Sequence, residues 1–228
     1  MVRIAVWFCA AACWAAPLAD LESARDRQDR AALEKITAES SAAAEKAPGD
    51  AEAQYRAALA ASYLAEVALE LRDRALAQRT AQAGIRAAER AIALKPDSAE
   101  YYRVLGTLCG QVIPANVLAG LSYGKRARDA VNKALELDPR SARAHIARGV
   151  GNYYLPPAFG GGVELAAADF RKAIALDPAA AADAWFWLGL ALRKQNDNRG
   201  AREAFAKSLA LNPRRVWARQ QLEKTPAQ

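Results

Sequence analysis

The chain has 228 residues, of which 53% are hydrophobic and 25% are charged, and it carries a net charge of +7 at pH 7. Much of the hydrophobic share is alanine, the best helix former, and extended runs of Val, Ile and Thr between hairpin turns are missing, which excludes a β-rich fold. The positive charges are interspersed with acids and form no basic block. The composition therefore favours acidic partners only mildly and speaks against a nucleic-acid-binding protein.

Residues 1–19 have the pattern of a secretory signal peptide: a short basic start, an unbroken apolar run over 4–16, and small residues before the first acid. The run of 13 residues is shorter than the roughly 20 that a membrane-spanning helix needs. Cleavage after Ala15 and cleavage after Ala19 both fit. Lipidation at Cys13 is an alternative, because the preceding alanines resemble a degenerate lipobox. We expect a periplasmic or otherwise exported protein with no transmembrane span in its mature chain.

Helix-forming segments follow in chain order, separated by breaks that contain proline and glycine. The predicted elements are an N-terminal helix over 21–46 within residues 20–48, helices over 51–70 and 73–94, helical pairs over 98–137, 141–176 and 181–211, and a closing helix over 214–224. Two insertions interrupt the pairs, one at 111–123 and one at 155–162. The second insertion contains Pro156 to Gly162 and is predicted to form a widened turn with Phe159 folded back as an anchor; a loop that contacts a partner is the alternative.

A short phrase recurs four times: a small residue, two aliphatic residues separated by one other residue, a polar residue and then proline. Its copies are Ala91–Pro96, Ala134–Pro139, Ala173–Pro178 and Ser208–Pro213. A fixed phrase at a period of roughly 34 to 45 residues indicates an array of helical repeats. The fold class is therefore all-α.

The last pair carries further residues at fixed spacing. They are Trp185, Leu188, Gly189, Leu192, Ala201, Phe205, Ser208 and Pro213. This pattern resembles the tetratricopeptide repeat, and the two preceding units match it through His145, Gly149 and Phe170, and through Tyr102 and Gly106. The resemblance implies a right-handed α-solenoid over 49–213, built from about four antiparallel helix pairs, with a cap over 214–228. It also implies a non-enzymatic scaffold that binds a protein or peptide. The Pro156–Gly162 insertion resembles one found in exported bacterial members of the family.

No catalytic, metal or cofactor site is predicted. His145 is the one histidine, Cys109 is the one cysteine beyond the leader, and both are expected to pack inside helices. The glycines at 160–162 lack the lysine and hydroxyl residue that a phosphate-binding loop needs. An enzyme would require a cluster of perturbed acids that the spacing does not reveal.

The first helix of each pair is expected to line a concave groove. In the repeat frame, the predicted groove residues are Arg103, Thr107, Arg143, Ile146, Tyr153, Phe186, Arg193 and Lys194. Their mixture of aromatic and basic side chains suits an extended peptide of acidic character. The alternative is a small-molecule-binding component that accompanies a periplasmic transporter. The sequence fixes neither the partner nor the oligomeric state.

Overall fold

In this computed structural model, residues 15–115 and 118–227 are described. They contain eleven α-helices and two short 3₁₀ helices, and no strand occurs among them. The helices are α1 (Ala15–Asp26), α2 (Arg30–Lys46), α3 (Ala51–Glu70), α4 (Arg74–Leu94), α5 (Ala99–Val112), α6 (Ala119–Leu137), α7 (Ala142–Tyr154), α8 (Val163–Leu176), α9 (Ala181–Lys194), α10 (Asn198–Leu211) and α11 (Val216–Glu223). The prediction of an all-α fold is confirmed.

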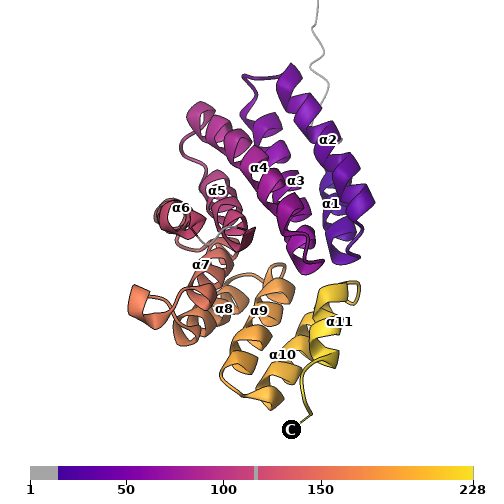
Figure 1. Cartoon of the computed structure of the whole chain (residues 1–228), viewed down its shortest axis with the longest axis vertical. Coiled ribbons are helices and arrows are strands. Elements are labelled where there is room, and N and C mark those ends of the chain that lie inside the picture. Colours follow the sequence, from indigo (N-terminus) through magenta and orange to yellow (C-terminus); the bar gives the residue numbers. More distant parts are fainter. Residues whose placement is uncertain (1–14, 116–117, 228) are drawn as a thin grey trace, which may run out of the picture.

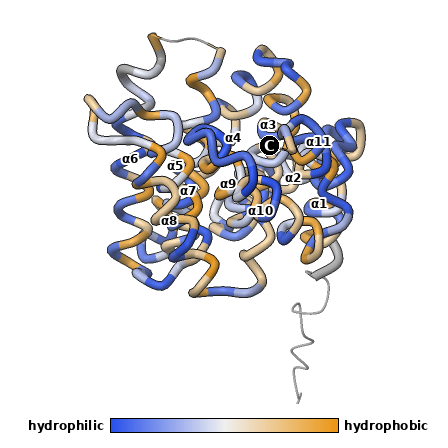
Figure 2. The backbone as a smooth tube through the Cα atoms, turned by 90° about the horizontal axis from the view of Figure 1, so that it is seen from below, coloured by the Kyte–Doolittle hydropathy of each residue, from blue (hydrophilic) through white to orange (hydrophobic). Residues whose placement is uncertain are grey.

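The helices form antiparallel pairs that stack into a curved array (Figure 1). The pairs are α3 with α4, α5 with α6, α7 with α8, and α9 with α10. Successive pairs stack mainly where the second helix of one pair meets the first helix of the next, as α4 meets α5 and α8 meets α9. Hydrophobic and hydrophilic stretches alternate along the helices, as expected when one stripe of each helix packs inward (Figure 2). The array is a solenoid of helix pairs, as predicted.

Two glycines show how the pairs approach closely. A Cβ atom added at Gly189 would lie 2.6 Å from Cε1 of Phe205, and one added at Gly149 would lie 2.5 Å from Cε1 of Phe170. Both phenylalanines are fully buried. Each glycine on the first helix of a pair thus makes room for the aromatic ring of the second helix, which explains why the pattern contains both.

The N-terminal segment differs from the prediction of one helix within 20–48. It is divided into α1 and α2, because Gln28 adopts a left-handed conformation with φ of 54°. Asp29 then caps α2 by accepting a hydrogen bond of 3.1 Å from the backbone N–H of Ala32. Without a proline or glycine at this point, the sequence gives little sign of the break.

Each of the two predicted insertions contains a short 3₁₀ helix, Ile113–Ala115 in the first and Pro157–Phe159 in the second, and residues 116–117 of the first lie outside the described residues. In the second, Gly160 and Gly162 have φ values of 83° and 127°, which only glycine adopts readily. Phe159 is 70% exposed, so the expectation that it folds back as an anchor is wrong.

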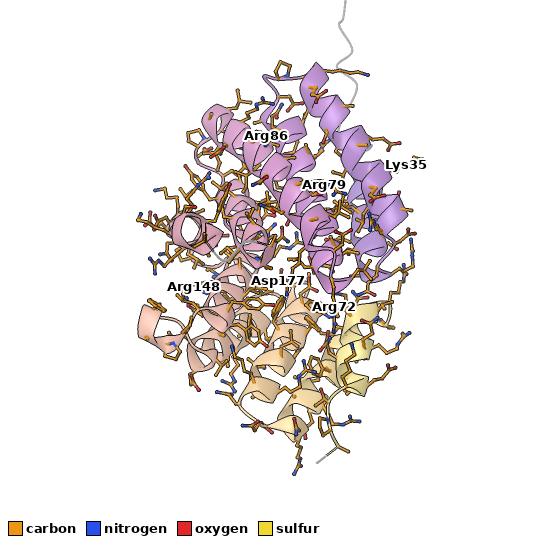
Figure 3. All side chains as sticks on the ribbon, in the orientation of Figure 1. Lys35, Arg72, Arg79, Arg86, Arg148 and Asp177 are labelled. Atoms are coloured by element: carbon orange, nitrogen blue, oxygen red, sulfur yellow. The ribbon has the colours of Figure 1, made fainter. Side chains whose placement is uncertain are left out.

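Most of the predicted signal peptide, residues 1–14, lies outside the described residues, and its last residues belong to α1. In the part of the chain that the structure describes, no helix is both long and apolar enough to cross a membrane. The outer surface is charged: Arg72, Arg79 and Arg86 are spaced along α4 and its preceding turn, and all three are exposed (Figure 3).

Candidate functional site

The first helices of the pairs, α3, α5, α7 and α9, contact one another in chain order, and α1 contacts α3; we call the surface that these helices share the inner face. On α5, Arg103 is held by Glu100 through hydrogen bonds of 2.7 Å from Nε and 2.6 Å from Nη2. The hydroxyl of Tyr55 on α3 donates to the same carboxylate at 3.1 Å. Burial raises the pKa of Glu100, but the Arg103 guanidinium outweighs burial and the pKa is lowered. The predicted groove residue Arg103 is therefore a buried ion-pair partner.

Helix α1 bridges several of the inner helices. Its Arg25 is 7% exposed, and Nη1 donates to Oδ2 of Asp183 on α9 at 2.9 Å. The same guanidinium lies 5.1 Å from the centre of the Tyr63 ring on α3. One turn earlier, Glu22 accepts a hydrogen bond of 3.3 Å from Arg143 on α7. A segment that the sequence placed before the repeats thus contacts three of them.

The end of the chain closes on its beginning through Arg215, just before α11. This side chain is 2% exposed, and Nη2 donates to Glu70 and, at 2.7 Å, to Glu66, both at the end of α3. Asn212 donates to Oδ2 of Asp26 at 2.7 Å. Figure 1 shows α11 just below the end of α1, in agreement with these contacts. We call the six charged residues at this seam the closure cluster. They are Arg25, Asp26, Glu66, Glu70, Asp183 and Arg215.

Two carboxyl groups of the closure cluster have pKa values that are shifted in opposite directions. Burial raises the pKa of Glu70 to about 7, although Arg215 and a hydrogen bond from Gln28 oppose the rise. Burial also raises the pKa of Asp183, but the guanidinium groups of Arg25 and Arg215 outweigh it, so this pKa is lowered. The closure cluster thus contains one carboxyl group whose pKa is raised, that of Glu70, and one whose pKa is lowered, that of Asp183.

One polar atom of the closure cluster is not satisfied. Among the described residues, Nε of Arg215 is buried without a hydrogen-bond partner, and its nearest ion-pair contact is Oδ1 of Asp26 at 4.0 Å. An unpaired buried donor typically costs about 1–3 kcal/mol. The seam therefore contains many charged groups, but one of its buried donors lacks a hydrogen bond.

A second part of the inner face is aromatic. Tyr153 on α7 lies edge-on to Trp187 with ring centres 6.0 Å apart, and Nζ of Lys194 lies 4.5 Å from the centre of the Tyr153 ring. Tyr154 is 65% exposed and also contacts Trp187. Lys194 donates to the backbone oxygen of Tyr153 at 2.8 Å, which fixes the end of α9 against α7.

Two predicted groove residues are engaged inside the protein. Phe186 is 1% exposed and lies 4.6 Å from Trp217 of α11, ring centre to ring centre, so it belongs to the core rather than to a groove wall. Arg193 donates to the side chains of Gln221 at 2.7 Å and Thr225 at 3.3 Å, which ties α9 to the C-terminal segment. The repeat frame placed both correctly on α9, but α11 covers that side of the helix.

The remaining predicted groove residues retain some exposure. Arg143 and Lys194 are exposed, while Thr107, Ile146 and Tyr153 are half-buried. Thr107 donates to the backbone oxygen of Arg103 at 3.1 Å. Their role in binding a partner stays a prediction.

The single histidine packs as expected. His145 is 2% exposed; its Nε2 lies 3.1 Å from the backbone oxygen of Pro139 and its Nδ1 lies 3.4 Å from Oδ1 of Asp169. Asp169 also accepts hydrogen bonds from Arg148 and Asn152. In the described ranges, no group of three or more His, Cys, Asp or Glu residues could hold a metal ion.

The sequence analysis missed the closure cluster, although one signal was present. Glu66 lies within a run over 57–69 that is otherwise nearly apolar, and Glu70 follows directly after it. Acids on the buried side of a helix are rare unless they are paired. Their spacing of four residues places both on one face of α3 and points to a basic partner from elsewhere in the chain.

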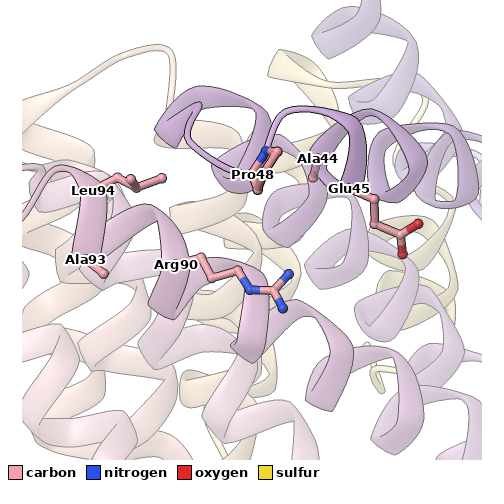
Figure 4. A pocket seen from close by; sticks show the side chains of 6 residues that line it. All are labelled: Ala44, Glu45, Pro48, Arg90, Ala93 and Leu94. Atoms are coloured by element: carbon pink, nitrogen blue, oxygen red, sulfur yellow. The ribbon is translucent and has the colours of Figure 1, made fainter.

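Two hollows of the surface lie apart from the aromatic part of the inner face. One of about 530 Å³ lies between the ends of α2 and α4 (Figure 4). Its lining residues are Ala44, Glu45, Pro48, Arg90, Ala93 and Leu94. A second, of about 290 Å³, follows the seam between α1 and the end of α10 and includes Glu22, Asp26 and Asn212.

Comparisons with known proteins agree with this architecture. The model of the family described as "Regulator of microtubule dynamics protein 1-3" matches residues 18–155, more than half of the chain, and the tetratricopeptide repeat model matches residues 182–215. Comparison with curated protein sequences gives no match.

Solved structures share the fold at low sequence identity. A thermophilic TPR protein in Thermus thermophilus, TTC0263, is 19% identical with a TM-score of 0.64, over 92% of this chain and 98% of that one. The HusA haemophore from Porphyromonas gingivalis is 20% identical with a TM-score of 0.59, over 76% of this chain and 94% of that one. At these identities the likeness concerns the fold alone.

Proposed function

Because the chain belongs to the family of regulator of microtubule dynamics proteins 1-3 and carries a tetratricopeptide repeat near its C-terminal end, we propose that it is a non-enzymatic scaffold that binds a protein or peptide on its inner face. The role named in the family description is that of the proteins after which the family is named, and it is not assigned to this chain. The proposal for this chain rests on its own inner face.

The observation that carries the proposal is the group of accessible basic and aromatic side chains at α7 and α9. Arg143 is exposed at the start of α7, and Tyr153 and the exposed Lys194 lie together at the far ends of α7 and α9. Aromatic and arginine side chains are over-represented where binding energy concentrates. Two cations flanking an aromatic surface suit a segment that carries acids next to an apolar side chain.

The test replaces these three residues together by alanine. The triple variant of Arg143, Tyr153 and Lys194 should lose capture of a partner from an extract of the source cells, as measured by quantitative mass spectrometry. Capture by the unchanged chain should weaken as salt rises from 50 to 500 mM, because exposed charges are screened over a Debye length of about 10 Å at 0.1 M and about 3 Å at 1 M. Circular dichroism should show unchanged helicity.

A matched control changes three exposed cations outside this group: Arg171, Lys172 and Lys207. Exposed charges contribute only about 0–1 kcal/mol each, so this variant should retain the same partner. Equal loss of capture from both variants would contradict the assignment of the binding face. A chain that retains no protein, but whose melting temperature is raised by a small molecule, would favour the transporter-associated alternative.

The proposal includes export to the cell envelope. It is supported by the basic start, the apolar run over 4–16 and the small residues that follow. An exported scaffold would meet its partner in the periplasm, where the closure cluster experiences the external pH.

A further inference from the structure

We propose that the inner face recognises a helical segment of the partner that presents an acid, an arginine and a second acid on one side, and that α1 occupies this position in the free chain. The proposal rests on the scaffold function above and specifies the chemistry of its partner. It makes α1 an internal competitor of that partner.

The contacts of α1 define the pattern that the inner face reads. Each of its three buried or half-buried charged residues meets a complementary side chain from another helix or its flanking turn. The pairs are Glu22 with Arg143 at 3.3 Å, Arg25 with Asp183 at 2.9 Å, and Asp26 with Asn212 at 2.7 Å. The spacing of three and then one residue places the three side chains on one side of a helix. The partners come from α7, from α9 and from the turn after α10, so no single repeat forms the site.

Apolar contacts of α1 are few. Leu21 and Ala24 are its buried hydrophobic residues within the described side chains, whereas Leu18 is 38% exposed and Asp20 is exposed. Charged pairs that become buried gain little net stability, because their desolvation offsets much of their attraction. A partner helix that keeps the three charged contacts and adds apolar ones would therefore bind this surface better than α1 does.

The connection between α1 and α2 allows α1 to leave. Gln28 has φ of 54°, a left-handed conformation that a residue with a side chain adopts only under constraint. Asp29 caps α2 by itself, so the start of α2 does not depend on α1. Undocking of α1 would therefore leave the cap of α2 by Asp29 in place.

The fit of α1 to this surface is incomplete at one point. Nε of Arg215 is buried and unpartnered, and Oδ1 of Asp26 stops 4.0 Å away. Oδ1 of Asp26 accepts hydrogen bonds from Nε and Nη2 of Arg25 instead, and we expect a glutamate, which is one carbon longer, to bridge the remaining distance to Arg215. The surface thus favours a glutamate at the position that Asp26 occupies, which α1 itself does not supply.

The pattern persists after either predicted cleavage. Glu22, Arg25 and Asp26 lie beyond both Ala15 and Ala19, so processing of a leader leaves all three contacts in the mature chain. The three charged residues of the competitor would therefore be retained after export.

The first experiment measures binding of a stapled, fluorescein-labelled helical peptide with the sequence of residues 15–28 to the full-length chain by fluorescence anisotropy. A chain carrying Arg25→Glu places a carboxylate against Asp183 and releases its own α1, which hydrogen exchange of the amides over 18–26 verifies. This variant should bind the peptide at least tenfold more tightly than the unchanged chain, in which α1 competes at the high effective concentration of a tethered segment. Equal affinity for both chains, or no binding to the released variant, would overturn the proposal.

A charge exchange provides the matched control. The peptide carrying Arg25→Glu should bind a full-length chain that carries Asp183→Arg at least tenfold more tightly than it binds the chain with the native aspartate. If the Arg25→Glu chain loses helicity, Glu22→Arg, which repels Arg143 from a more exposed position, releases α1 in its place. If the exchanged peptide binds the Asp183→Arg chain and the chain with the native aspartate equally well, the charges do not select the segment.

A third arm tests the incomplete fit. The peptide carrying Asp26→Glu should bind the released variant about tenfold more tightly, because it gives Arg215 the missing acceptor. Unchanged affinity would overturn the predicted preference for glutamate. If none of the peptides binds, but the triple variant of the inner face still loses capture of the partner, an α1-like partner is excluded. The scaffold function itself would be unaffected by that result.

Discussion

Replacement of Arg215 by methionine tests whether the closure cluster holds the two ends of the array together. The methionine retains the aliphatic volume but removes the hydrogen bonds to Glu66 at 2.7 Å and to Glu70. Glu70, whose side chain is 1% exposed, then keeps Gln28 as a donor at 2.7 Å but loses its cation. Removing one partner of a buried ion pair costs about 3–5 kcal/mol.

The expected loss depends on pH. Since burial raises the pKa of Glu70 to about 7, this carboxylate is mostly charged at pH 8 and mostly protonated at pH 5.5. The destabilisation by Arg215→Met should therefore approach about 3–5 kcal/mol at pH 8 and be smaller at pH 5.5. At about 2–4 °C per kcal/mol for a chain of this size, the melting temperature at pH 8 should fall by roughly 6–20 °C.

The assay is thermal and urea unfolding at both pH values, followed by circular dichroism. Arg214→Met is the matched control, because the neighbouring Arg214 is exposed and its removal should change stability by less than about 0.5 kcal/mol. A loss below about 1 kcal/mol at pH 8, or a greater loss at pH 5.5 than at pH 8, would refute the reasoning.

Three further outcomes are expected. Because burial raises the pKa of Glu70 from 4.5 to about 7, the folded chain binds more protons than the unfolded chain between these pH values. The stability that this group contributes therefore falls as pH rises, by at most about 1.4 kcal/mol per pH unit. Glu70→Gln should remove this pH dependence of the free energy of urea unfolding, and an unchanged dependence would exclude Glu70 as its source. Gly189→Leu should destabilise the chain by about 1–3 kcal/mol through its clash with Phe205, whereas Gly151→Ala, which meets no atom within 4 Å, should not; equal midpoints would contradict the packing described. A fusion of residues 1–30 to a reporter active only outside the cytoplasm should give signal, and intact leader on protein recovered from the cytoplasm would argue against export.

Most of the fold could be predicted because its determinants are local. The recurring phrase that ends at Pro96, Pro139, Pro178 and Pro213 marks the end of the second helix of each pair, and the structure ends α4, α6, α8 and α10 at the leucine two residues before each proline. Proline disfavours the helical conformation of the residue before it, so the signal lies within the segment that it terminates.

The break between α1 and α2 could not be predicted in the same way. It occurs at Gln28, and glutamine is a good helix former that rarely adopts positive φ. The turn is fixed by contacts with distant residues: Nε2 of Gln28 donates to Glu70 at 2.7 Å, and its Oε1 accepts from Gln220 at 3.3 Å. Local propensity carries no information about such contacts.

The site was predicted in part for a related reason. The repeat frame assigned the predicted groove residues to the first helices of the pairs, and Arg143, Tyr153 and Lys194 retain some exposure on these helices. It could not anticipate that α11 would cover Phe186, or that α1 would reach Asp183 across 158 positions of the chain. The period of a repeat describes neighbouring units, whereas these contacts join the two ends of the array.

The chemistry of the seam between those ends bears on how the array could work. Within each pair the helices are joined by buried apolar side chains, such as Phe205 against Gly189. The ends are joined instead by Arg25, Asp183 and Arg215, whose ion pairs add specificity of position but little net stability once desolvation is counted. An array closed by apolar contacts would stay closed, because opening it would expose hydrophobic surface to water. An array that is closed by charged side chains can open, because water then hydrates the separated charges. Exchange of α1 for a partner helix requires such an opening.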